Sequence, residues 1–103
     1  MKFTISGPLK NNIYNTMRDA GYHFQREDNE HDATEYSFVR PRVGFPRFHI
    51  YAKIGGNDLT ISLHLDQKKP VYLGSAAHSG DYDGPAIEHE AERIKQMIEN
   101  PTH

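Results

Sequence analysis

One β-hairpin is predicted by the stretch Arg47–Asp66, which reads RFHIYAKIGGNDLTISLHLD. Apolar and polar residues alternate on both sides of Gly55–Asp58, whose composition is that of a tight turn. Closing the hairpin at this turn matches apolar residues with each other along one whole face, and a shift by one residue would break every match. The apolar pairs are Ile54 with Leu59, Ala52 with Ile61, Ile50 with Leu63 and Phe48 with Leu65.

The opposite face of the same hairpin sets His49 against His64. Opposed side chains on paired strands have Cβ atoms roughly 4.5–5.5 Å apart, so two imidazoles placed in this way can share one ligand. We therefore expect a functional site on this face. Its predicted pairs are Lys53 with Thr60, Tyr51 with Ser62, His49 with His64 and Arg47 with Asp66.

Composition restricts the class of protein. A chain of 103 residues forms one domain, which we expect at residues 1–100, followed by a frayed tail at 101–103. There is no cysteine, which excludes disulfides, thiolate metal sites and cysteine nucleophiles. A net charge of −2 is no global signature of a nucleic-acid binder. No apolar run approaches the roughly 20 residues that cross a bilayer, so we expect a cytoplasmic protein without membrane contact.

The rest of the chain predicts three further strands and two amphipathic helices. Glu27–Ala33 is expected to be a loop, and Gln67–Gly84 is expected to be a long irregular segment because prolines and glycines interrupt it. The expected elements are strand Lys2–Ile5, helix Pro8–Ala20, strand Tyr22–Arg26, strand Glu35–Arg40, the two hairpin strands and helix Pro85–Asn100.

These elements predict an α+β fold with the order β-α-β-β-β-β-α. The apolar stripe of each helix needs a surface to cover, and the hairpin offers one continuous apolar face. We expect a two-layer sandwich in which a mainly antiparallel sheet of four or five strands carries both helices on one face. The face with the two histidines is then left to solvent or to the long segment after the hairpin.

A metal site is the first functional hypothesis. Zinc and other divalent transition metals accept imidazole and carboxylate ligands together, and a catalytic zinc site needs only three protein ligands. His49 and His64 supply two ligands from strands, and Asp66 lies on the same face. The long segment offers two more candidates, His78 and Asp81. Such a site would bind zinc or a related metal and would be suited to support hydrolysis.

Three alternatives remain open from the residues alone. The two histidines without metal could act as a general acid and a general base. A basic and aromatic surface could bind nucleic acid or phosphate, because cations neutralise phosphates and aromatic rings stack on bases. A module that binds a protein partner without any chemistry fits the same sequence. The residues of the nucleic-acid or phosphate surface would be Arg40, Arg42, Arg47, Tyr51, Lys53 and Lys68.

Overall fold

The computed structural model of the chain describes residues 1–30, 33–67, 80–81 and 83–99. The predicted α+β fold is confirmed, and a two-residue strand is added before the last helix. The predicted tail at 101–103 lies outside the described residues. The elements are β1 (Lys2–Ile5), α1 (Ile13–Asp19), β2 (His23–Glu30), β3 (Ala33–Arg40), β4 (Arg47–Gly55), β5 (Asp58–Asp66), β6 (Gly80–Asp81) and α2 (Pro85–Glu99).

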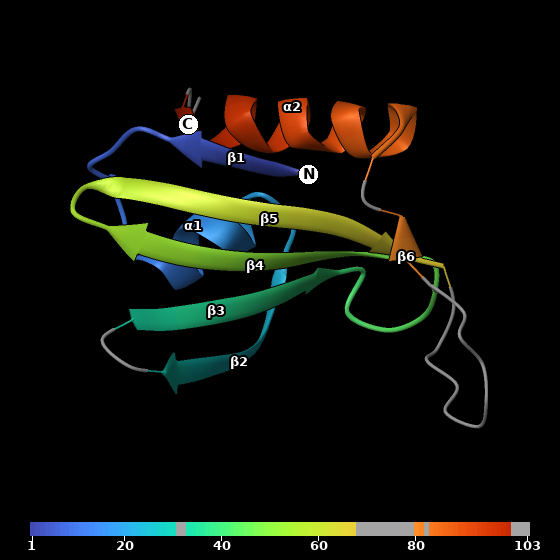
Figure 1. Cartoon of the computed structure of the whole chain (residues 1–103), viewed down its shortest axis with the longest axis horizontal. Helices are drawn as coiled ribbons and strands as arrows, with labels where there is room; N and C mark the ends of the chain where they lie inside the picture. The colour runs from blue at the N-terminus through green and yellow to red at the C-terminus, as the bar shows by residue number, and fades with distance from the viewer. Residues whose placement is uncertain (31–32, 68–79, 82, 100–103) are drawn as a thin grey trace.

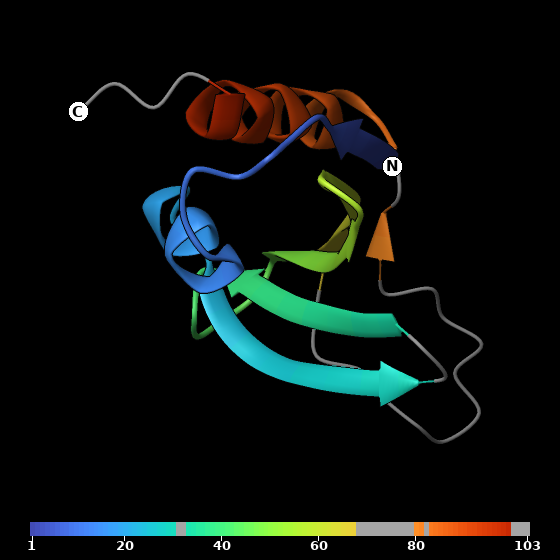
Figure 2. The same ribbon diagram turned by 90° about the vertical axis from the view of Figure 1, so that its left-hand side faces the viewer.

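The sheet is antiparallel throughout, with the strand order β1-β5-β4-β3-β2 (Figure 1). On its side away from β4, β5 pairs with β1 along its first half and with β6 at its last two residues. Both helices lie on the same side of the curved sheet (Figure 2). Among the described elements, no helix covers the other face, which we call the outer face. No described helix is long and apolar enough to cross a membrane.

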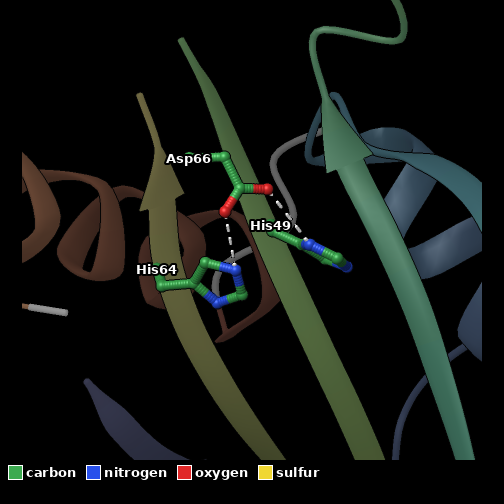
Figure 3. Close-up of side chains that lie close together, drawn as sticks. All are labelled: His49, His64 and Asp66. Carbon is green, nitrogen blue, oxygen red and sulfur yellow. Dashed lines mark ion pairs between the residues drawn. The ribbon is translucent and has the colours of Figure 1, made fainter. Parts of the chain in front are cut away.

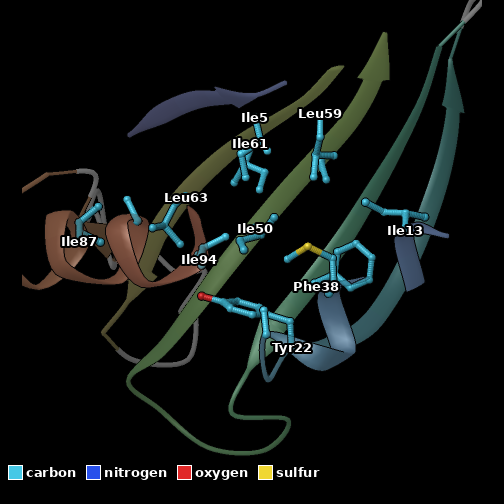
Figure 4. Close-up of a cluster of buried hydrophobic side chains, with 14 residues drawn as sticks. Ile5, Ile13, Tyr22, Phe38, Ile50, Leu59, Ile61, Leu63, Ile87 and Ile94 are labelled. Carbon is cyan, nitrogen blue, oxygen red and sulfur yellow. The ribbon is translucent and has the colours of Figure 1, made fainter. Parts of the chain in front are cut away.

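The hairpin has the predicted register, from Arg47 opposite Asp66 to Gly55 opposite Asp58. Its apolar face forms the centre of the core, against which both helices pack (Figure 4). One predicted apolar position, Ile54, is 46% exposed because it lies next to the turn at the end of the sheet. The most deeply buried hairpin residues, at most 1% exposed, are Ile50, Ala52, Leu59, Ile61 and Leu63, and the helices contribute Ile13, Met17, Ile87, Ala91 and Ile94.

Helix α1 is shorter than predicted, because it begins at Ile13 and not at Pro8. The side chain of Asn12 accepts a hydrogen bond from the backbone N–H of Asn15 at 2.8 Å and caps the helix there. The preceding segment passes so close to the β4–β5 turn that a Cβ at Gly7 would overlap the carbonyl oxygen of Asn57. Contact with the turn therefore holds this segment in a non-helical path.

The prediction of a loop over Glu27–Ala33 is wrong, because β2 continues to Glu30 and β3 begins at Ala33. Glu27, Asp28 and Asn29 extend the outermost strand with exposed side chains, so this part of the strand forms without an alternation of apolar residues. A β-bulge between Phe24 and Arg26 places one extra residue, Gln25, opposite β3.

A buried carboxylate joins α2 to the sheet. Glu90 is only 3% exposed and accepts a hydrogen bond from the Tyr22 hydroxyl at 2.7 Å. Arg93 contacts the same carboxylate at 2.8 Å and donates to the carbonyl of Ala20 at 2.6 Å. Arg40 of β3 binds both carboxylate oxygens at 3.2 Å. This network satisfies a charge that would otherwise be costly to bury.

Candidate metal centre

Three side chains of the hairpin meet on the outer face. His49 lies opposite His64 and Arg47 lies opposite Asp66, as the register requires. The Asp66 carboxylate points toward both imidazoles (Figure 3). Its Oδ1 lies 3.0 Å from His64 Nε2 and its Oδ2 lies 3.4 Å from His49 Nδ1. One possible ligand atom from each residue lies within 4.8 Å of the other two, so the three residues form a compact group of nitrogen and oxygen donors.

The two histidines are mostly buried although no described helix covers them. His49 is 6% exposed, and the His64 side chain is 12% exposed. The ring of Tyr51 stacks on that of His49 with centroids 4.5 Å apart, and the two imidazole centroids are 4.8 Å apart. Neighbouring rings on the sheet surface therefore shield one another from water.

Burial keeps both imidazoles neutral at pH 7. For His49, burial and then the nearby His64 lower the pKa to about 4, against the opposing effect of Asp66. For His64, burial likewise lowers the pKa despite the contact with Asp66. A neutral imidazole has a lone pair on one nitrogen, which is the form that binds a metal ion.

A short chain of hydrogen bonds orients the His49 ring. Ser37 of β3 donates its hydroxyl proton to Gln25 Oε1 at 2.8 Å, and its Oγ lies 2.7 Å from His49 Nε2. A serine hydroxyl has one proton, so with that proton directed at Gln25 Oε1 the proton of the second hydrogen bond is on His49 Nε2. The neutral ring then directs the lone pair of Nδ1 at the Asp66 carboxylate. In this tautomer, Nδ1 and the carboxylate are both free of protons and could bind one cation together.

The opposite orientation of the Gln25 amide would reverse this chain. Ser37 would then donate to His49 Nε2, and Nδ1–H would donate to Asp66, which is the connectivity of a Ser-His-Asp triad. A catalytic serine must reach its substrate, and Ser37 is only 1% exposed. We therefore assign Ser37 to positioning the imidazole and not to nucleophilic attack.

Arg47 also contacts the Asp66 carboxylate, with its Nε 3.3 Å from Oδ2. Its guanidinium lies over the ring of Phe45, 4.6 Å from the centroid, and this contact holds the cation at the edge of the site. Any competition between Arg47 and a metal for the Asp66 carboxylate therefore concerns Oδ2. The other oxygen, Oδ1, faces His64.

The predicted ligands are brought together only in part. His49, His64 and Asp66 form the group, whereas His78 lies outside the described residues. Asp81 lies in β6, where its backbone pairs with Leu65 of β5. The side chain of Asp81 is outside the described part of the chain. Ser37 and Gln25 were missed by sequence reasoning. For Ser37, the sequence showed only a polar residue within a predicted strand. Nothing in the sequence indicated the β-bulge that places Gln25 next to Ser37.

The described residues of the alternative surface have different surroundings. Arg40 binds Glu90 on the helix side of the sheet, Arg47 binds Asp66, and Lys53 lies 3.8 Å from Glu35. Arg42 is exposed in the connection between β3 and β4, and Tyr51 stacks on His49. Lys68 lies outside the described residues.

Comparison of the chain with protein-family models, with curated proteins and with solved structures finds no match. The chemistry of the centre is therefore inferred from its own geometry.

Proposed function

We propose that the protein binds a divalent transition metal through His49, His64 and Asp66, and that zinc is the first candidate for this metal. The observation that supports this proposal is the Asp66 carboxylate held between the two imidazoles, 3.0 Å from His64 Nε2 and 3.4 Å from His49 Nδ1. Ligating histidines in metal sites commonly donate their second ring N–H to a fixed acceptor, and Ser37 occupies that position for His49.

The distances suit zinc after a small adjustment. Zinc–ligand bonds of about 2.0–2.2 Å in a tetrahedron separate the ligand atoms by about 3.3 Å. Both carboxylate–imidazole distances are already near this value, at 3.0 and 3.4 Å. The widest separation in the group, up to 4.8 Å, would have to close by about 1.5 Å when zinc binds.

Three protein ligands leave a fourth zinc position for water. A zinc-bound water is acidic enough to supply hydroxide near neutral pH, which is the basis of hydrolysis by zinc enzymes. We propose hydrolysis as the use of this metal. Zinc-loaded protein should then cleave an activated phosphate ester, p-nitrophenyl phosphate, faster than metal-free protein does, and equal rates would contradict hydrolysis without affecting the metal site.

Zinc titration of the untagged protein against a chromophoric chelator tests metal binding. We expect stoichiometric binding with submicromolar affinity, and we expect His64→Ala to weaken it by at least about 100-fold, more than loss of an outer contact does. His23→Ala is the matched control, because His23 lies on β2 in the same row of the sheet as His64 and is exposed. Absence of binding, or an equal loss in both variants, would overturn the proposal.

A further inference from the structure

A shallow pocket of about 360 Å³ adjoins the metal centre. It lies on the outer face, where the register sets Lys2 of β1 beside Ser62 of β5, and Ser62 beside Tyr51 of β4. His64 belongs both to this pocket and to the group of possible metal ligands. A volume of this size is within the usual range for small-molecule sites of about 300–1,000 Å³. The described lining residues are Met1, Lys2, Tyr51, Ser62, Leu63 and His64.

The charge of the lining favours an anion. Lys2 is the one charged side chain among the described lining residues, and no carboxylate is among them. Within the described part of the chain, Lys2 makes no ion pair. A second pocket on the outer face, of about 150 Å³, has a lining of the opposite charge, because it contains two carboxylates, Asp28 and Glu35, and one cation, Lys53. A cationic pocket and an acidic pocket thus lie on the same sheet face.

We propose that the pocket beside His64 binds the oxyanion group of a small ligand. Lys2 and the hydroxyl of Ser62 would bind the oxyanion from the side of β1, and a metal at the His49–His64–Asp66 group would attract it from the other side. This inference rests on the proposed metal function, since the metal supplies most of the positive charge. A phosphate group or a carboxylate group satisfies the same chemistry.

Calorimetric titration of the zinc-loaded full chain with inorganic phosphate, and separately with acetate at equal ionic strength, tests the pocket. We expect at least one of the two to bind, about tenfold more weakly in Lys2→Gln, which is the effect of losing one charge-assisted hydrogen bond. Zinc affinity should stay unchanged in this variant, because Lys2 is exposed and is not among the described ion-pair partners of Asp66. The anion that binds more tightly in wild type identifies the ligand group.

Lys10→Gln is the matched control, because Lys10 is an exposed lysine in the segment that precedes α1. It should change neither the anion affinity nor the zinc affinity. Anion binding that is equal in wild type and Lys2→Gln, or absent, would overturn the pocket while leaving the metal centre standing. Failure of zinc to bind wild type is a separate result, which overturns the metal centre itself.

Discussion

Replacing Ser37 with alanine should weaken zinc binding although Ser37 does not touch the metal. Its Oγ lies 2.7 Å from His49 Nε2, and at 1% exposure Ser37 is out of contact with bulk water. Loss of such an outer contact lowers metal affinity by about 10–100-fold, or about 1.4–2.7 kcal/mol. The buried Nε2–H left without an acceptor should also cost about 1–3 kcal/mol of folding stability.

Two measurements on the same samples separate these effects. Competitive zinc titration gives the affinity, and thermal unfolding of the metal-free protein gives the stability, with about 4–8 °C expected per kcal/mol for a chain of this size. Ser62→Ala is the control, because Ser62 is a serine of the same face that contacts neither imidazole through a hydrogen bond in the described structure. A folded Ser37→Ala protein that binds zinc as tightly as wild type would refute the role given to Ser37.

The remaining predictions concern stability. Glu90→Ala should lower the free energy of unfolding by about 1–3 kcal/mol in denaturant titrations, because it leaves the buried Tyr22 hydroxyl without its acceptor; an unchanged free energy of unfolding would contradict this. Burial alone would raise the pKa of Glu90, but hydrogen bonds, chiefly from Arg93, outweigh it and lower the pKa. The carboxylate's contribution is therefore complete above about pH 4.5 and lost as pH falls through the lowered value, so Glu90→Gln should flatten the acid side of a stability profile from pH 7 to pH 2. Gly7→Ala should destabilise the protein by about 1–3 kcal/mol through overlap with Asn57, whereas Gly55→Ala, which meets open space, should be close to neutral in the same unfolding assay; similar effects of both would argue against the close contact.

The hairpin register was predictable because the signal is local and redundant. Four apolar pairs agree on one register, and a shift by one residue would break all of them. The same reasoning placed His49 opposite His64 and Arg47 opposite Asp66. The buried face of α2 was also predictable, since a period of three to four residues is a property of the helix itself.

Features that depend on a distant partner were not predictable. The polar residues Glu27–Glu30 continue strand β2 because β3 offers hydrogen-bonding partners along its edge. Their own sequence pattern does not indicate a strand. The bulge that brings Gln25 to Ser37 is a property of two strands together. The pattern of the last helix does not indicate the surroundings of Glu90, which are Tyr22 and two arginines.

The sequence by itself determined which residues of the hairpin face each other, because strand alternation and a glycine turn act over a few residues. Tertiary structure decided how that face is used. It turned Asp66 toward both imidazoles, placed Ser37 behind His49, and directed Arg40 to Glu90 on the far side of the sheet. Burial and hydrogen bonding depend on which strands become neighbours. They are therefore set only when the whole sheet has formed.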